Sequence, residues 1–276
     1  PSGTKVKITV SRDGTLIPFE ITRDRIPVNC VDAAFMVNDT IGYIKLSKFT
    51  RTTHKEVSEA SKKLLKSGMK RLIFDLRDNT GGYFDQALLL SNHFLNKGDA
   101  IVYMEGRERP KQDYDADGRG DMKDIELSVL IDEGTASSSE IFAGAIQDND
   151  RGVIVGRRSF GKGLVQEQIP MRDGSAVRLT IARYYTPSGR CIQKPYDNID
   201  NYEKEVYERY INGELDSDSA KTPSDSVKYY TKNGRVVYGG GGITPDIIIT
   251  RDTLGATPYY IKLHNSGTLY EYAFRY

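Results

Sequence analysis

The sequence predicts an α/β fold built around a largely parallel sheet. Between residues 41 and 156, short apolar runs rich in β-branched residues alternate with segments whose apolar residues recur at helical spacing. The helical segments begin near Ser or Thr and end close to glycines. The chain has 276 residues, 38% of them hydrophobic, which is enough to bury the core of one large domain, or of one domain plus part of another.

The expected elements follow from these patterns in chain order. Two runs with β-branched residues at alternate positions flank Arg-Asp-Gly at 12–14 and predict a hairpin. Thr53 and Glu56 have the spacing of a capping box ahead of a helix that Gly68 ends. The predicted strands are residues 5–10, 16–22, 41–49, 71–77, 100–106, 127–132, 152–156 and 176–186. The predicted helices are residues 54–68, 83–98 and about 137–147.

The chain divides into three parts by character. Residues 1–27 carry the hairpin, residues 28–250 carry the α/β pattern, and residues 251–276 form a C-terminal extension. Within the second part, residues 196–242 are rich in charges, serines and tyrosines, which predicts a partly ordered surface insertion. The chain opens abruptly on a strand-like run and stops abruptly in LYEYAFRY. We therefore expect an excised piece of a longer protein.

Composition excludes several classes of function. The 39 basic and 38 acidic residues leave a net charge of +1 and are interspersed, so no nucleic acid partner is expected. No apolar run of about twenty residues and no signal peptide occur. Cys30 and Cys191 form no CxxC pair and are predicted to be packing residues. The three histidines are His54, His93 and His264, and they are not spaced as metal ligands. The reaction predicted for this chain requires neither a metal nor an organic cofactor.

The stretch GTASSSE at 134–140 has two interpretations. Ser137 and Glu140 have the spacing of a capping box, in which the serine oxygen accepts a helical N–H and the glutamate reaches back. Alternatively, one serine is a nucleophile that needs a base and two oxyanion donors. Because histidine is scarce, the candidate base is Lys162 in SFGKG, which follows a buried strand. A lysine accepts a proton only in its neutral form, which desolvation favours.

Several motifs together resemble the C-terminal processing, or tail-specific, serine peptidases. TASSSE and FGKG match the family's core motifs and place Ser137 and Lys162 25 positions apart. DLRDNTGG at 75–82, ARYYTPSGRCIQ at 182–193 and GITPDI at 242–247 match further signatures. The resemblance implies a crotonase- or Clp-protease-like ββα spiral core with a mixed sheet. It also implies that Ser137 is the nucleophile.

The resemblance implies further roles and a setting. Gln166, four residues after the lysine, would orient it. The hairpin would be the end of a truncated PDZ-like domain that gathers substrate tails, although an ordinary hairpin packed on the core stays open. The family works outside the cytoplasm, in the bacterial periplasm or cell envelope. Substrates would be proteins or peptides bound by their C-terminal tails. The assembly state is open and includes a homo-oligomer.

The oxyanion donors follow from helix geometry. At the start of a helix the N–H of Ser138 points outward in the positive end of the helix dipole. The second donor is predicted to be Gly81 or Gly82, because a glycine lets a peptide approach closely. A straight strand would hold Lys162 about 13 Å from Gln166. We therefore predict a bend near Gly161 and Gly163.

Two acidic features have competing interpretations. Asp148, eleven residues after Ser137, matches an acid of the family, and is equally an exposed acid near the helix end or a partner of Arg151. DYDADGRGDMKD nearly matches a calcium loop, but strands are expected on both sides, which favours a solvated acidic turn. The residues in question are Asp113, Asp115, Asp117, Gly118, Asp121 and Asp124.

The function that fits best is a Ser-Lys endopeptidase that cleaves proteins near their C-termini through an acyl-enzyme. Two alternatives remain. One is a non-catalytic binding module on the same fold, which would be expected to lack the serine or the lysine. The other is a crotonase-like acyl-CoA enzyme, which shares the oxyanion logic without needing the Ser-Lys pair.

Overall fold

The computed structural model describes residues 1–24, 29–196, 198–216, 227–251 and 257–276. Its main body contains a six-stranded sheet in the order β14-β9-β8-β5-β4-β3. All neighbours in this sheet are parallel except β3 and β4, so the sheet is mixed. The strands are β3 Val31–Met36, β4 Ile41–Leu46, β5 Arg71–Asp75, β8 Glu126–Ile131, β9 Val153–Gly156 and β14 Ile247–Ile248.

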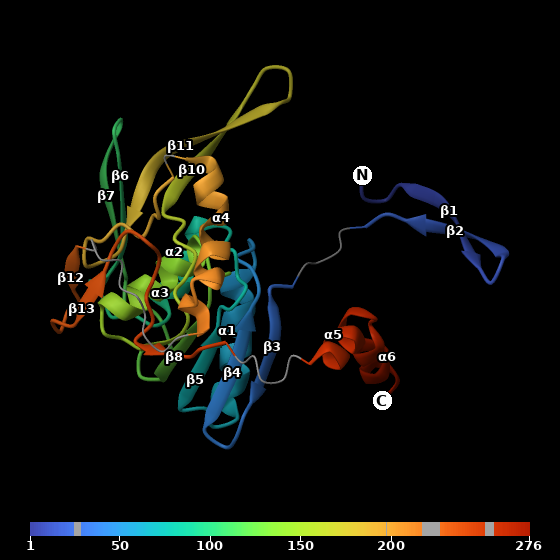
Figure 1. Ribbon diagram of the computed structural model, residues 1–276, viewed down its shortest axis with the longest axis horizontal. Coiled ribbons are helices and arrows are strands. Elements are labelled where there is room, and N and C mark those ends of the chain that lie inside the picture. Colours follow the sequence, from blue (N-terminus) through green and yellow to red (C-terminus); the bar gives the residue numbers. More distant parts are fainter. Residues whose placement is uncertain (25–28, 197, 217–226, 252–256) are drawn as a thin grey trace.

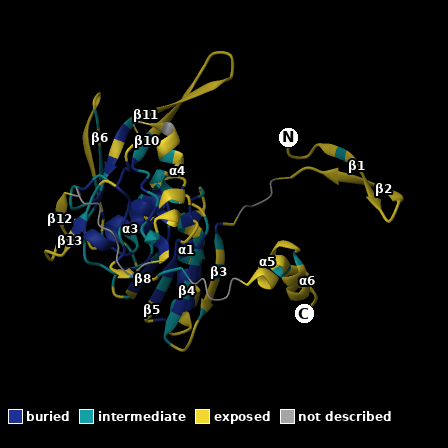
Figure 2. Cartoon of the chain, viewed as in Figure 1, coloured by how far each residue is buried: buried dark blue, intermediate teal, exposed yellow. Residues whose placement is uncertain are grey.

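Three helices pack with this sheet and bury the core (Figures 1 and 2). They are α1 Thr53–Lys66, α2 Phe84–Asn92 and α3 Ser138–Asp148. Every residue of α3 is buried, which explains its run of small and apolar residues. Phe74 of β5 contacts Phe94 and Phe142, with ring centroids 6.2 and 5.2 Å apart, so the helices and the sheet share one aromatic cluster.

A second, antiparallel sheet has the order β10-β11-β6-β7. Its strands are β6 Ala100–Gly106, β7 Arg109–Asp115, β10 Leu164–Pro170 and β11 Ala176–Tyr185. The tips of the β6-β7 and β10-β11 hairpins extend from the body and are largely exposed (Figures 1 and 2). The β10-β11 hairpin begins just after the predicted catalytic lysine, so this sheet borders the site.

The remaining elements are small. The predicted N-terminal hairpin is confirmed as β1 Lys5–Arg12 paired with β2 Thr15–Thr22. The C-terminal extension contains α5 Pro258–Asn265 and α6 Thr268–Arg275, which have no buried residue. Residues 196–242 contain α4 Ile199–Ile211, the 3-10 turn η1 Glu214–Asp216, and the pair β12 Lys228–Tyr230 and β13 Val236–Tyr238. In the described part of the chain no helix is long and apolar enough to span a membrane.

Several sequence predictions need correction. The segment before residue 41 contains strand β3, and strands β7 and β10 were not predicted at all. The second helix ends at Asn92, because Asn92 and His93 instead bind the loop that carries Asp117 and Met122. The capping box at Thr53 is absent: Thr53 is already helical, and Glu56 accepts the backbone N–H groups of residues 30 and 31 at 2.8 and 3.2 Å.

The insertion also differs from the prediction of a partly ordered surface segment. In the described residues, α4 and η1 bury Arg209 and Leu215 against the body. Val237 of β13 is buried as well. Arg209 is buried through hydrogen bonds and an ion pair and not through an apolar stripe, so helical periodicity does not reveal its burial. Residues 217–226, which belong to the same predicted insertion, lie outside the described residues.

Asp75, at the end of β5, provides a stability test. Its side chain is fully buried and accepts hydrogen bonds from Tyr43 Oη at 2.6 Å and from Arg77 Nη2 at 2.7 Å. Burial alone would raise the pKa of Asp75, but the bonds from Arg77 and Tyr43 outweigh it and hold the pKa below its usual value. A lowered pKa stabilises the fold above the unfolded-state pKa of about 3.9, and this contribution is lost as pH falls further.

We therefore expect Asp75→Asn to destabilise the protein by about 2 kcal/mol at pH 7. Arg77 is half exposed, so solvent weakens its pairing with Asp75 and keeps the expected effect below that of a fully buried pair. The difference between variant and wild type should shrink below about pH 4. Urea unfolding at pH 7 and at pH 3.5 measures it. A difference that stays constant over this range would contradict the assignment.

Candidate active site

The site lies where three parallel strands end. β5, β8 and β9 are neighbours, and the loops after them are 76–83, 132–137 and 157–163. Because the carboxyl ends of parallel strands meet at one edge of a sheet, the topology brings DNTGG, GTASSSE and SFGKG together. A cavity of about 1040 Å³ opens there, and its lining includes Gly81, Gly82, Ser137, Lys162 and Gln166. Ser137 and Lys162, the predicted nucleophile and base, therefore line the same cavity.

Ser137 precedes α3 in an unusual backbone conformation. Its φ is 58° and its ψ is −118°, a combination that costs free energy for a residue with a Cβ. A sharp strand-to-helix turn of this kind presents a nucleophilic serine at the top of a sheet in other hydrolases. The residue types of GTASSSE do not by themselves predict this backbone conformation. It supports the nucleophile interpretation, because an ordinary N-cap residue adopts relaxed β-region angles.

Glu140 joins the serine loop to the lysine loop. Its carboxylate is fully buried, and Oε2 accepts the backbone N–H groups of Ser137 and Lys162, each at 2.8 Å. These two nitrogens are thus at most twice that distance apart. Oε1 accepts hydrogen bonds from Ser159 Oγ at 2.5 Å and from the Gly161 N–H at 2.7 Å. The predicted return bond from Glu140 to Ser137 is present, but the glutamate's bonds to the lysine loop were not predicted.

Burial raises the pKa of Glu140, and its hydrogen bonds from Ser159 and the backbone oppose the rise. In Glu140→Gln an amide NH₂ would face N–H donors across a buried site. We expect a loss of about 3 kcal/mol of stability and a fall in kcat on the order of 100-fold. Chemical denaturation and initial rates measure the two effects. Glu133→Gln, which alters the Glu133-Arg157 pair instead, is the control, and equal rates in both variants would refute the bridging role.

The candidate oxyanion donors differ in their partners. The N–H of Gly81 donates to Asn79 Oδ1 at 2.9 Å. The N–H groups of Ser138 and Gly82 have no acceptor among the described residues. A Cβ on Gly81 would lie 2.6 Å from the carbonyl oxygen of Ala136 and 2.8 Å from the Ser138 nitrogen, so only glycine permits this approach. Of the two predicted glycines, Gly82 is thus the one with an available donor.

Lys162 lies in a loop rather than in a strand. Gly161 has a φ of 88°, which produces the predicted bend, and β10 begins at Leu164. Within the described part of the chain, no carboxylate pairs with the Lys162 side chain and no hydrogen bond links it to Gln166. Gln166 is exposed in β10, opposite Thr180. The structure places both side chains at one cavity without joining them.

Asp148 lies at the other end of α3 from Ser137, about 16 Å along the helix. Two of the predicted alternatives for it are wrong, because it is buried and its partner is Arg190 at 2.7 Å rather than Arg151. Asp148 also accepts a hydrogen bond from Thr186 Oγ1 at 2.5 Å. Arg151 instead donates to backbone carbonyls, including that of Phe94 at 2.8 Å. Asp148 thus fixes the turn after β11, and the structure does not bring it to the cavity.

The aspartates of DYDADGRGDMKD bind different partners. Asp113 pairs with Lys111 at 2.9 Å, Asp117 accepts from Asn92 at 2.6 Å, and Asp121 accepts from His93 at 2.8 Å. Nowhere in the described ranges do three His, Cys, Asp or Glu side chains gather as a metal site would need. Asp113 and Asp115 belong to strand β7, so the predicted acidic turn is wrong for them, and only residues 116–125 form the connection to β8.

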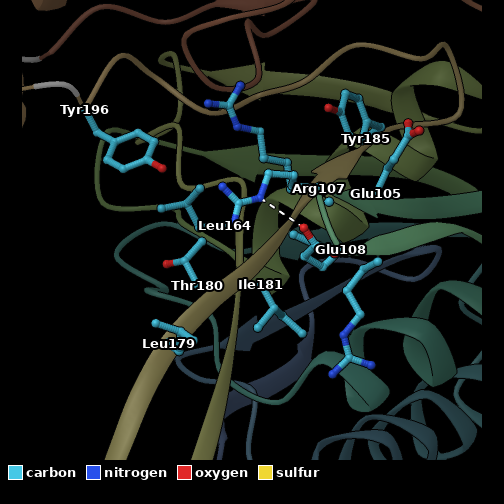
Figure 3. Close-up of a pocket in the computed structure, with 13 residues that line it drawn as sticks. Glu105, Arg107, Glu108, Leu164, Leu179, Thr180, Ile181, Tyr185 and Tyr196 are labelled. Carbon is cyan, nitrogen blue, oxygen red and sulfur yellow. Dashed lines mark ion pairs between the residues drawn. The ribbon is translucent and has the colours of Figure 1, made fainter.

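A second cavity of about 690 Å³ is lined by the β6-β7 turn and by β11 (Figure 3). The Arg107-Glu108 ion pair, 3.3 Å long, lies at its edge, and Tyr196 lines it from the start of the insertion. It shares Leu164 with the larger cavity but contains neither Ser137 nor Lys162. The candidate chemistry is therefore confined to the larger cavity.

Comparison with known proteins agrees with this geometry. The model of peptidase family S41 matches residues 40–200. A carboxy-terminal-processing protease from Bartonella bacilliformis is 42% identical over 70% of this chain and 45% of its own length. A carboxyl-terminal-processing protease from Synechocystis is 37% identical over 70% of this chain and 46% of its own length. The chain therefore spans about half the length of the curated relatives it matches.

Among solved structures, the photosystem II D1 C-terminal processing protease is 32% identical. It superposes with a TM-score of 0.54 and covers 70% of this chain, which in turn covers 53% of that protein. The matched region contains all three loops that form the cavity. Motifs, fold and relatives thus agree, and this chain belongs to peptidase family S41.

Proposed function

We propose that this chain carries the catalytic site of a serine endopeptidase that cleaves protein substrates near their C-termini. The observation that supports this most is the bridge made by Glu140, which holds the backbones of Ser137 and Lys162 at one cavity through two 2.8 Å hydrogen bonds. A non-catalytic binding module would not need a strained serine whose backbone is held close to that of a lysine with no carboxylate partner in the described part of the chain. The family membership agrees with the same reaction class.

The reaction proceeds in two steps through an acyl-enzyme. The amine of Lys162 takes the proton of Ser137 Oγ as the oxygen attacks the scissile carbonyl, and the amine then protonates the leaving nitrogen. The N–H groups of Ser138 and Gly82 stabilise the oxyanion, each contributing on the order of 3 kcal/mol. Water, activated by the same amine, then releases the acyl product. Gln166 would orient Lys162 once substrate brings the two side chains together.

The cavity wall favours a substrate with a free carboxylate. Lys48, Arg51 and Arg178 line it together with Lys162, and none of the described lining residues is acidic. None of the first three forms an ion pair with a carboxylate in the described part of the chain. A positive cavity without counterions attracts negatively charged groups. The terminal carboxylate of a polypeptide, one to a few residues beyond the scissile bond, would satisfy this charge.

Four further expectations extend the proposal, and the first three rest on the family resemblance. The β1-β2 hairpin would be the end of a PDZ-like domain that docks substrate tails by strand addition. The spiral arrangement of the core would match crotonase-like folds. The enzyme would work outside the cytoplasm, in the periplasm or cell envelope, and its assembly state includes the homo-oligomer as an option.

Product mapping tests the proposal directly. The full-length protein is incubated with a polypeptide that has a free C-terminus and with the same polypeptide amidated there, and mass spectrometry identifies the fragments. We expect cleavage near the free C-terminus, slower cleavage of the amidated form, and none with Ser137→Ala. Binding without any cleavage would instead support the binding-module alternative.

A further inference from the structure

We propose that the insertion holds the catalytic-lysine loop in place, and that Arg209 of α4 is a positioning residue for Lys162. The inference rests on the proposed function, in which Lys162 is the base. The loop that carries Lys162 forms hydrogen bonds with two charged side chains, Glu140 of α3 and Arg209 of the insertion.

Arg209 binds the carbonyl oxygens of the lysine loop. Its side chain is 2% exposed, and Nη1 donates to the carbonyl of Ser159 at 2.8 Å. Longer bonds of 3.4 Å reach the carbonyls of Arg158 and Phe160. Three consecutive carbonyls that precede Gly161 and Lys162 thus converge on one guanidinium, whose planar fork suits several acceptors.

The N–H groups of the same loop are held by the body. Glu140 accepts those of Gly161 and Lys162, and Gln193 Oε1 accepts that of Gly163 at 2.8 Å. The Gly161 carbonyl accepts the backbone N–H of Lys194 at 3.0 Å. With both sides of these peptides bound, little freedom remains for the backbone at Lys162. Arg209 is the residue of the insertion that binds the loop's backbone carbonyls, while Glu214 and Tyr202 of the insertion contact the side chains of Arg158 and Phe160.

Ion pairs centred on Glu205 hold the Arg209 side chain in position. Glu205, one turn earlier on α4, accepts Arg209 Nε at 2.5 Å and Lys194 Nζ at 3.1 Å. The Lys194 side chain is 1% exposed, and its Nζ lies 3.9 Å from the ring centroid of Phe160 and 4.4 Å from that of Tyr202. Such buried charges are costly to desolvate. Their cost suggests that they specify the position of the loop rather than add bulk stability.

The test compares Arg209→Ala with Arg235→Ala in the full-length protein. Arg235 is an arginine of the same insertion that binds two carboxylates, Asp150 and Asp246, each at 2.6 Å, and within the described ranges it forms no hydrogen bond or ion pair with residues 158–163. Both variants lose ion pairs, although the Arg235 side chain is 43% exposed and that of Arg209 is buried. We expect only Arg209→Ala to release the loop. Arg209→Lys, which keeps the charge but cannot reach all acceptors, serves if Arg209→Ala does not fold.

Hydrogen-deuterium exchange and steady-state kinetics are read together. With Arg209→Ala we expect the amides of 161–163 to exchange at least tenfold faster and kcat to fall on the order of 10- to 100-fold, with KM within about twofold. The acid limb of the kcat/KM profile should shift, and added guanidinium ion should restore part of the rate. Arg235→Ala should lower Tm while leaving the exchange of 161–163, kcat and the pH profile unchanged.

The outcomes separate the two proposals. Unchanged exchange at 161–163 in Arg209→Ala overturns the positioning role whether or not the enzyme is active. Faster exchange with an unchanged kcat and pH profile overturns the positioning role as well. In that case the mobility of the loop would not affect the function of Lys162 as the base. Absence of cleavage by the wild type refutes the proposed function, and the exchange data still decide whether Arg209 holds the loop.

Discussion

Replacement of Ser137 by alanine is expected to lower kcat on the order of 10⁴-fold or more, with little change in substrate binding. The hydroxyl is the atom that forms the acyl-enzyme, and the remaining oxyanion donors cannot substitute for a nucleophile. Ser137 lies at the cavity in a strained backbone that the surrounding structure maintains. Single-turnover kinetics with acid quench and intact-mass detection should show an acylated wild-type enzyme and no acylated variant.

Ser139→Ala is the matched control for this experiment. Ser139 belongs to the same trio, but its Oγ is buried and donates to the carbonyl of Asn79 at 3.0 Å. We expect it to retain most of the activity at some cost in stability. If Ser137→Ala still forms the covalent species, the nucleophile is a different residue and the proposed mechanism is wrong.

The second large effect is expected at Lys162. Lys162→Ala should reduce kcat on the order of 10²- to 10⁴-fold, the range for loss of a general acid-base group. Lys162→Arg is the more informative variant, because a guanidinium keeps the positive charge but cannot give up its proton in a protein. We expect it to be as inactive as the alanine variant. Initial rates across a pH series measure both.

Lys70→Arg, a change at an exposed lysine, controls for the general effect of the substitution. Substantial activity in Lys162→Arg would contradict the role of base and would assign the lysine a purely electrostatic role at the cavity. Because the bond to Glu140 is made by the backbone N–H of Lys162 and not by its side chain, we expect neither substitution to move the loop. Amide exchange at 161–163 verifies this.

The sequence alone determined the parts that depend on local patterns. Alternating apolar residues and glycine stops located β4, β5, β8, β9 and β11 and all three core helices, because side-chain period and turn chemistry are local properties. The spacing of Ser137 and Lys162, with the glycines between 75 and 82, was sufficient to propose the site. These residues lie on loops after parallel strands, so the topology alone brings them together.

The tertiary structure alone decided which polar groups bind one another. Glu140 reads as a capping residue in sequence, yet it bonds to a loop about twenty residues away. Asp148 reads as exposed and is buried against Arg190. Arg209 lies in a segment that composition marks as surface, and it is buried on the lysine loop. A hydrogen bond between residues far apart in the sequence produces no periodic pattern of residue types. It forms only where the fold has brought both partners together, so local patterns cannot predict it.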